Sequence, residues 1–358
     1  MGWYDIYPFP PNTPAPYNDE STYGRVAAWG YADIVESSVP DINAGQTVYG
    51  FLPISSAIET VRVEFASHAG KRINDQIIVL DEHRQHLWKI YNRYQICSSL
   101  PDLEKDRGLD SLGWDALMQG LFATGYNLST FGFAWTEQNR IHPSGKGECS
   151  SSDADLRDAA IVVLNASGKT GMSFAYALRH NRPKSAQPKL IVGVGSSASV
   201  DAIRKSSLFD TVALNSEHST TASTISSLHP RRIVLLDFGA RPDVCPTWST
   251  TLSSSPDIPF TQITIGGEVA PQNPETAKKR LAMLATTVLV NASLLREKGI
   301  ESGGESYFEG FYEAWEGFKR QIKGMGLEWG EGVQGWEGGW EGLCRDEVRA
   351  GRGLVFRV

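Results

Sequence analysis

Cysteine is scarce in this chain, and its few cysteines are far apart. Among the 358 residues there are four, Cys97, Cys149, Cys245 and Cys344, and no two of them form a C-x-x-C pair. A zinc knuckle or a redox dithiol therefore has no support, and a disulfide framework is not expected in so long a chain. We expect reduced thiols, as in a cytosolic protein.

The sequence also lacks long apolar runs and clusters of basic residues. The longest apolar stretch, LAMLATTVLV at 281–290, falls well short of the roughly 20 residues that cross a bilayer as a helix. The N-terminal sequence MGWYDIYPFPPN has neither the basic nor the apolar region of a secretory signal. A net charge of -7 without a basic face argues against nucleic acid as the main partner. We expect a cytoplasmic protein whose partner is a small-molecule substrate, not nucleic acid or a membrane.

The middle of the chain alternates short β-branched runs with stretches that are compatible with helices. Strands are expected at 159–165, 189–195, 210–214, 231–239 and 259–267, with helices at about 171–180 and 199–207. Continuous apolar strands that alternate with helices are typical of a parallel sheet covered on both faces. The pattern predicts an α/β fold, a doubly wound parallel sheet of the Rossmann type.

The segments on either side have a different character. Before the alternating segment, turn-separated runs predict strands at 26–37, 46–54, 59–65 and 76–80, and apolar spacing predicts helices at 84–97 and 112–125. After it we expect helices at 274–297 and about 305–323, and a final buried strand at 353–358. Phe308, Phe311, Trp315 and Phe318 would share one face of the second helix, as core packing.

The sequence IVVLNASGKTG at 161–171 predicts a strand, a loop and the start of a helix. Backbone N–H groups and the positive end of a helix dipole attract phosphate, and small residues allow it to approach. The predicted phosphate-binding residues are Asn165, Ser167, Gly168, Lys169, Thr170 and Gly171. The match to G-x-G-x-x-G is imperfect, because Ala166 occupies the position of the first glycine of the motif. A Walker A loop would need a glycine at position 163, which is Val163. An ordinary strand-to-helix turn without a ligand is the alternative.

The end of the second strand bears on the choice of cofactor. An acidic residue there would hydrogen-bond to the ribose 2′-OH of NAD. The sequence after Gly195 has no carboxylate before Asp201, and Ser196 with the downstream Arg204 could accommodate a 2′-phosphate instead. NADP is therefore favoured over NAD, although Arg204 and Lys205 could also be merely solvated helix residues.

Six phrases along the chain have a distinctive order: WGYADIVES (29–37), VYGFLP (48–53), IYNRYQ (90–95), LFATGYNL (121–128), NASGKTGMSFAYAL (165–178) and LLDFGA (235–240). Together they resemble the uncharacterised family DUF2855, which is similar to zinc-independent, quinone reductase-like medium-chain dehydrogenases/reductases. The resemblance implies a nicotinamide dinucleotide between two lobes. It also implies a partial GroES-like lobe at 1–125, because the family carries further residues before the position of Trp3. A Rossmann domain at 126–272 and a C-terminal segment at 273–358 that returns to the first lobe would follow.

The resemblance implies a reductase that acts on an activated double bond, quinone or carbonyl. Tyr94 and Asn92 could orient or donate to a carbonyl, and Thr124 matches the region beside the nicotinamide, although structural hydrogen bonding is an alternative for each. His83 and His86 lie in the charged stretch DEHRQH, and we expect no metal. A homodimer is plausible for this superfamily. The alternatives are a catalytically silent dinucleotide-binding protein and a non-redox enzyme of specialised metabolism.

Overall fold

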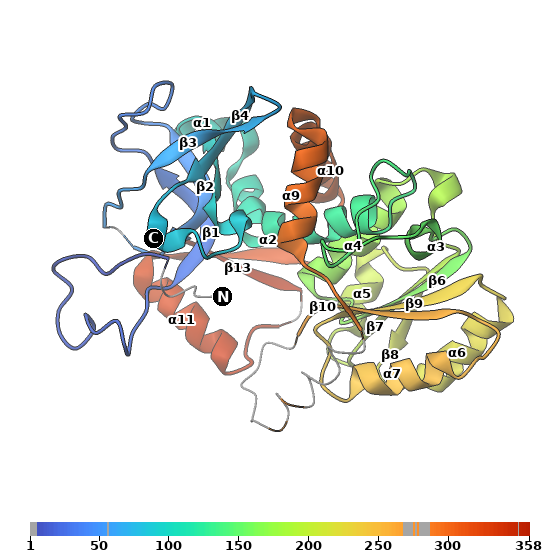
Figure 1. Cartoon of the computed structure of the whole chain (residues 1–358). Helices are drawn as coiled ribbons and strands as arrows, with labels where there is room; N and C mark the ends of the chain where they lie inside the picture. Colours follow the sequence, from blue (N-terminus) through green and yellow to red (C-terminus); the bar gives the residue numbers. More distant parts are fainter. Residues whose placement is uncertain (1–5, 56, 268–274, 276–277, 279–286, 350) are drawn as a thin grey trace. The chain divides into compact units, whose positions relative to one another are not determined.

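The computed structural model describes residues 6–55, 57–267, 275, 278, 287–349 and 351–358 (Figure 1). The chain divides into two compact units. Unit 1 consists of Met1–Gly120, Gly303–Phe308 and Leu327–Val358, and unit 2 consists of Leu121–Ser302 and Glu309–Gly326. Each unit is described separately.

Unit 2 is built on a six-stranded sheet in which every neighbouring pair of strands is parallel. Its strands are β6 (Ala159–Leu164), β7 (Leu190–Gly195), β8 (Thr211–Leu214), β9 (Arg232–Phe238), β10 (Phe260–Gly266) and β11 (Val288–Leu289). Their order across the sheet is β11-β10-β9-β6-β7-β8. Numbered by position in the chain this is 3-2-1-4-5-6 read from the β8 edge, the strand order of dinucleotide-binding domains. The predicted doubly wound sheet is confirmed.

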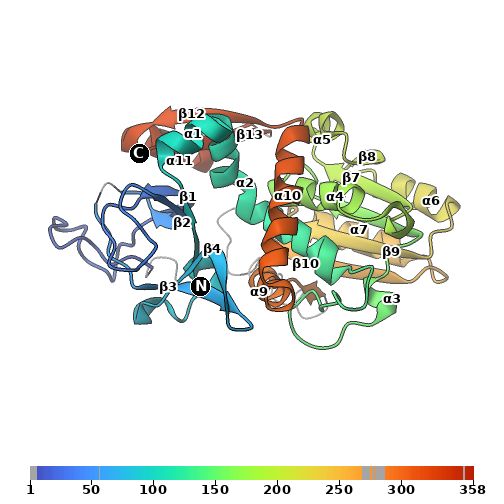
Figure 2. The ribbon, with the colours of Figure 1, turned by 90° about the horizontal axis from the view of Figure 1, so that it is seen from above.

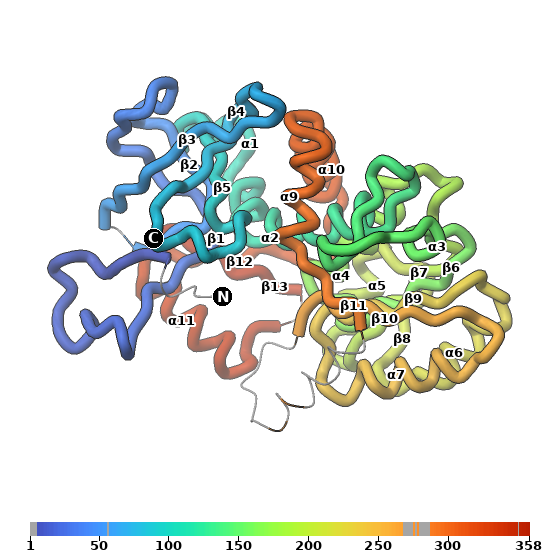
Figure 3. Tube along the Cα trace, in the orientation of Figure 1, coloured from blue at the N-terminus to red at the C-terminus, as the bar shows by residue number. Residues whose placement is uncertain are grey.

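Helices return the chain between these strands. They are α4 (Lys169–His180), α5 (Val200–Ser206), α6 (His218–Ser227) and α7 (Val244–Ser253). The single turn α3 (Ser151–Ala154) precedes β6, and the 3₁₀ turn η5 (Lys184–Ala186) precedes β7. Helices α6 and α7 lie side by side on one face of the sheet, as Figure 1 and the continuous trace of Figure 3 show. Under them the fully buried Trp248 packs with residues of the central strands.

The core of unit 2 also contains a group of aromatic rings from α2 (Leu109–Asn127), α4 and α10 (Glu305–Gln321). The ring of Phe122 lies 5.1 Å from Trp315 and 5.2 Å from Phe318, measured between centroids. Trp315 and Phe318 are each 1% exposed, which confirms that the aromatic stripe of α10 is core packing. Figure 2 shows α10 beside α4, where Tyr176 meets Phe318 edge to face.

Unit 1 contains a five-stranded antiparallel sheet of order β1-β2-β5-β4-β3. The strands are β1 (Ala27–Asp33), β2 (Thr47–Pro53), β3 (Val63–His68), β4 (Lys71–Val79) and β5 (Arg93–Cys97). The predicted β-rich lobe is confirmed, including the pairing of β3 with β4. Helix α1 (Leu100–Arg107) follows β5, and the first part of α2 belongs to this unit.

The helix predicted at 84–97 is wrong. The segment contains the 3₁₀ turn η3 (Lys89–Asn92) and then β5, and η2 (Glu82–Arg84) precedes it. Tyr94 and Ile96 point into the core of the sheet, and β5 pairs with both β2 and β4. Pairing with two strands from elsewhere in the chain therefore overrides the apolar spacing that favoured a helix.

Two expectations for the last third of the chain also need correction. The predicted helix 274–297 lies partly outside the described residues, and within them Val288–Leu289 pairs with β10 as β11 before α9 (Ala292–Gly303) begins. β-branched residues favour a strand there, and the Asn291 side chain accepts the N–H of Leu294 at the start of α9.

The final strand is β13 (Arg352–Arg357). It is half-buried, and among the described residues it pairs with β12 (Gly326–Glu331) in a two-stranded sheet, with α11 (Gly332–Cys344) between them in sequence. No helix among the described residues is long and apolar enough to cross a bilayer.

Candidate functional site

The turn after β6 begins with Asn165 in a left-handed conformation. Every residue of β6 is buried, and Asn165 leaves the strand with φ 55°. Asparagine adopts this conformation more readily than most residues. Its amide Nδ2 donates to the carbonyl oxygen of Phe238, 3.2 Å away at the end of β9, and its own carbonyl accepts the N–H of Gly168 at 2.9 Å. The turn is thereby fixed to the neighbouring strand.

The two glycines of the turn lie where the backbone folds tightly on itself. A Cβ atom on Gly168 would lie 3.1 Å from the carbonyl oxygen of Asn165, and one on Gly171 would lie 3.2 Å from the same atom. Contacts this short require neighbouring atoms to move. Glycine at both positions therefore keeps the turn compact and its backbone open to a close ligand.

Helix α4 begins at Lys169 without a side-chain cap. Gly168 is its N-cap residue, and the first helical hydrogen bond runs from the N–H of Met172 to the carbonyl of Gly168 at 3.0 Å. The N–H groups of Lys169, Thr170 and Gly171 find no acceptor in the part of the chain that the structure describes. Free N–H groups at a helix start, together with the helix dipole, form a site suited to an anion.

Lys169 adds a positive charge at this helix start. Its side chain is partly buried, and burial lowers the pKa of its ammonium group. Arginines of the same unit have carboxylate partners: Arg157 pairs with Asp155 and Arg179 pairs with Asp210. Within the described ranges Lys169 has no carboxylate partner. A partly desolvated ammonium without a counter-ion fits a ligand that brings its own negative charge.

Strand β7 ends beside the turn, where the N–H of Ala166 donates to the carbonyl of Val194 at 3.0 Å. The N–H of Ser196 donates to Ser199 Oγ at 3.0 Å, so part of the polar capacity of this loop is used locally. Arg204 lies in the last turn of α5, where its Nη1 is 3.2 Å from Asp201 Oδ1 in an exposed ion pair. Val194, near the end of β7 and two residues before Ser196, thus lies beside the turn after β6, whereas Arg204 has a partner on its own helix.

Asn92 and Tyr94 belong to a buried network in unit 1. The Asn92 side chain accepts from Arg84 Nε at 3.0 Å and donates to the carbonyl of Arg84 at 2.9 Å. The Tyr94 hydroxyl donates to the carbonyl of Phe51 and accepts from Arg84 Nη2, each at 2.9 Å, and it also bonds to the Tyr7 hydroxyl. Burial raises the pKa of Tyr94, which is 3% exposed. Both side chains thus have hydrogen-bond partners within unit 1, and the catalytic role predicted for them stays a prediction.

Thr124, the third predicted catalytic residue, lies in unit 2. It is a partly exposed residue of α2, one position before Gly125, whose Cβ would lie 2.6 Å from the backbone nitrogen of Phe174 in α4. Helix α2 therefore packs closely on α4 at this point. It continues into the π-helical turn η4 (Leu128–Gly132).

Sequence reasoning missed Asp237, near the end of β9, which supports the turn after β6. Asp237 Oδ1 accepts the N–H groups of Gly239 at 2.9 Å and Ala240 at 2.8 Å, so the Phe238 carbonyl is held where Asn165 reaches it. Strands β6 and β9 are adjacent, and the connections that follow them lead toward opposite edges of the sheet. Their junction is the switch point at which doubly wound sheets bind ligands. An aspartate two residues before a glycine at a strand end is the signal that could have revealed this turn.

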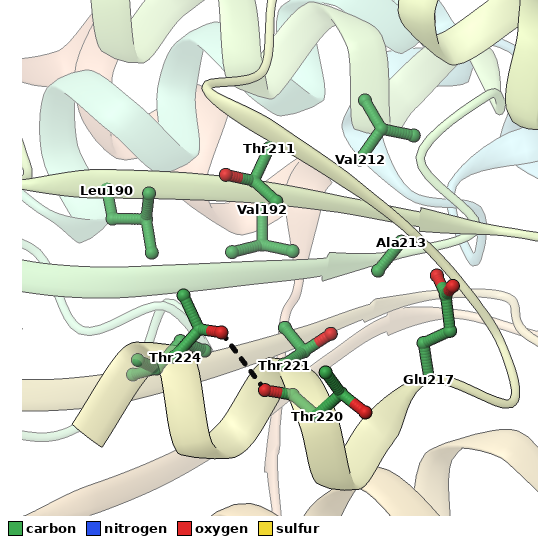
Figure 4. A pocket seen from close by; sticks show the side chains of 10 residues that line it. Leu190, Val192, Thr211, Val212, Ala213, Glu217, Thr220, Thr221 and Thr224 are labelled. Carbon is green, nitrogen blue, oxygen red and sulfur yellow. Dashed lines mark hydrogen bonds between the residues drawn. The ribbon is translucent and has the colours of Figure 1, made fainter. Parts of the chain in front are cut away.

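A separate hollow of about 200 Å³ lies between β7, β8 and α6 (Figure 4). Its floor is apolar, with Val192 and Ala213, and threonines of α6 form its rim. Thr224 Oγ1 donates to the carbonyl of Thr220 at 3.1 Å, and Glu217 accepts the N–H of Leu214 at 2.7 Å. No residue of the phosphate turn lines this hollow, and its one charged side chain is acidic. It does not suit a phosphate group.

Within the described ranges, no group of three or more His, Cys, Asp and Glu side chains could hold a metal ion. His83 Nε2 instead lies 3.1 Å from the carbonyl of Ile6, in a hydrogen bond to the backbone.

The strand order defines a doubly wound α/β domain of the Rossmann type, and comparison with known proteins identifies the family. The model of the family described as "Protein of unknown function (DUF2855)" matches residues 1–349, so the chain belongs to this family. No curated protein matches the sequence.

Solved structures show a weak likeness. The human synaptic vesicle membrane protein VAT-1 homolog-like protein has 15% identity and a TM-score of 0.43, covering 94% of this chain and 78% of its own. CurA of Vibrio vulnificus in complex with NADPH has 10% identity and a TM-score of 0.42, covering 93% and 90%. Mycobacterial Rv1454c complexed with NADPH has 13% identity and a TM-score of 0.45, covering 95% and 86%. Likeness at this level carries no argument about ligands, and the fold rests on the strand order of this chain.

Proposed function

We propose that unit 2 binds NADP and that the protein is an NADP-dependent oxidoreductase of the zinc-independent type. The observation that carries the proposal is the uncapped start of α4 at the switch point of the sheet, with Lys169 beside it and without a counter-ion. These are the groups that a pyrophosphate needs.

The residues of the turn fit a dinucleotide. The N–H groups of Lys169, Thr170 and Gly171 would hold the pyrophosphate, and Gly168 would allow its close approach. Residues 196–200 contain no carboxylate that would repel a 2′-phosphate. Ser196 would bind that phosphate, and Arg204 would contribute if it exchanged its Asp201 partner for the ligand.

Bound NADPH supplies a hydride, and the protein's part is to bind, orient and exclude water. An activated double bond, a quinone or a carbonyl is the proposed substrate class, because reducing it requires a hydrogen-bond donor for the developing oxyanion and no metal. Thr124, a partly exposed hydroxyl residue of α2, is the proposed donor from unit 2.

Calorimetric titration with NADPH and NADH tests the binding step. We expect NADPH to bind and NADH to bind more weakly. Equal affinities would refute the 2′-phosphate assignment, and the absence of binding to either would refute the proposal. Oxidation of NADPH, followed at its absorbance band with a panel of quinones and enones, then tests the reductase.

A second candidate is a dinucleotide-binding protein without catalytic activity. It is favoured by the internal hydrogen bonds of Asn92 and Tyr94, which leave neither side chain free to act on a substrate. NADPH binding without oxidation across the whole panel would support this candidate over the reductase.

A further inference from the structure

Helix α11 has an unusual composition. Its sequence GVQGWEGGWEGLC contains five glycines at 332, 335, 338, 339 and 342, and no residue of the helix is buried. Glycine disfavours a helix because it loses more backbone freedom on folding than other residues. The helix must therefore be held by what its glycines contact.

The glycine face of α11 packs on the sheet of β12 and β13. A Cβ on Gly339 would lie 2.5 Å from Phe356 Cζ and 3.3 Å from Leu354 Cδ1, so a larger residue would push the helix off the sheet. A Cβ on Gly342 would lie 3.8 Å from Val348 Cγ2, in ordinary contact. This face is the inner face of the helix.

An apolar stripe runs along the adjacent face. Its members are spaced by three, four and three residues, and they are Val333, Trp336, Trp340 and Leu343. Val333 is 53% exposed, Trp340 is 49% exposed and Leu343 is 56% exposed. The rings of Trp336 and Trp340 lie 5.7 Å apart between centroids. Single exposed apolar residues are common, but a stripe with the spacing of a helix-pairing seam is a mark of an interaction site.

The charged residues of α11 are both acidic. Glu337 and Glu341 are exposed and follow the two tryptophans by one residue each, so they line the side of the stripe opposite the glycine face. Glu331 and Glu347 add negative charge before and after the helix, whereas Arg345 pairs with Glu341 at 2.6 Å. The stripe thus has an acidic border.

We propose that the stripe of α11 is the docking surface for a basic amphipathic helix of a partner protein. The partner's apolar side chains would pack between Val333, Trp336, Trp340 and Leu343. Its lysines or arginines would meet Glu337, and they would meet Glu341 in exchange for Arg345. The acidic border selects this occupant by charge. A second copy of α11 would place glutamates beside glutamates, and an anionic membrane would repel them.

A fluorescein-labelled two-heptad peptide of leucine and lysine, with leucines at the seam positions, is the probe. Its fluorescence anisotropy should rise on titration with the protein, and a matched peptide with glutamate in place of lysine should not bind. The double variant Trp340→Glu and Leu343→Glu should weaken binding by about thirtyfold, the loss expected at an interface hot spot. Glu337→Lys, a change at an exposed position outside the stripe, should also weaken binding of the lysine-containing peptide.

The control is Ile58→Glu, which changes a 78% exposed apolar residue of unit 1 outside α11 and should bind like the wild type. Far-ultraviolet circular dichroism would establish that each variant is folded. Equal binding by the wild type and both α11 variants would overturn the proposal. So would preferential binding of the glutamate peptide, tighter binding to phospholipid vesicles than to the peptide, or a dimer in sedimentation that Trp340→Glu dissociates.

Discussion

Replacing Lys169 with methionine removes the positive charge at the start of α4 and keeps most of the side-chain volume. A charge-assisted hydrogen bond contributes about 1.5–3 kcal/mol. Because Lys169 is only partly buried, we expect a loss near the lower half of that range, about 2 kcal/mol, or about a thirtyfold weaker affinity for NADPH.

The assay is calorimetric titration with NADPH near neutral pH, and Lys184→Met is the matched control. Lys184 is an exposed lysine of unit 2 that lies after the carboxyl end of α4, in η5. The control should bind NADPH like the wild type. An unchanged affinity in Lys169→Met would refute the assignment of this ammonium group to the phosphates.

The pH dependence of the same variant gives a second test. Burial lowers the pKa of Lys169 from its ordinary 10.5, so the unfolded chain binds this proton more readily than the folded one. Between the lowered pKa and 10.5 the free energy of unfolding should therefore rise with pH, and NADPH affinity should fall as the ammonium loses its proton. Lys169→Met should remove both trends, and their persistence in the variant would contradict this reasoning.

Three further substitutions, one in unit 1 and two in unit 2, test the packing of each unit by urea unfolding. Asn165→Ala should lower the free energy of unfolding by about 1–2 kcal/mol because alanine disfavours the left-handed conformation, and Asn165→Gly should cost less; equal costs would contradict this cause. Asp115→Ala should lower it by about 3 kcal/mol because Asp115 is fully buried and pairs with Arg107 at 2.6 Å, and a loss below about 1 kcal/mol would mean that the pair behaves like a surface one. Gly125→Leu should cost at least about 1–3 kcal/mol because its Cβ would lie 2.6 Å from the Phe174 nitrogen, and a neutral effect would contradict the close packing of α2 on α4.

The strand, turn and helix start at 161–171 could be predicted from the sequence because their signals are local. A buried β-branched run, small residues and a helix-forming segment follow one another within 161–171, and β6 and α4 form there as expected. The backbone geometry of Asn165, and its bond to Phe238, could not be predicted in this way. They depend on β9, which lies far along the chain and is brought alongside β6 by the sheet.

Segment 84–97 shows why other predictions failed. Its apolar residues are compatible with a helix and with a strand, and the pairing of β5 with β2 and β4 decides between them. The same pairing buries Tyr94 beside Arg84, a contact between side chains that the type of residue alone could not reveal. No element was predicted at 332–344, where five glycines disfavour a helix, and α11 forms there with Gly339 packed against Phe356.

Hydrogen–deuterium exchange of the full chain with and without NADPH tests the central claim most directly. The account predicts that NADPH slows exchange in peptides that contain residues 165–172, where free N–H groups begin α4, and in those that contain Ser196. Peptides that contain Asn92 and Tyr94 should exchange alike in both states. Saturating NADPH that leaves residues 165–172 unprotected would contradict the claim that this turn binds the dinucleotide.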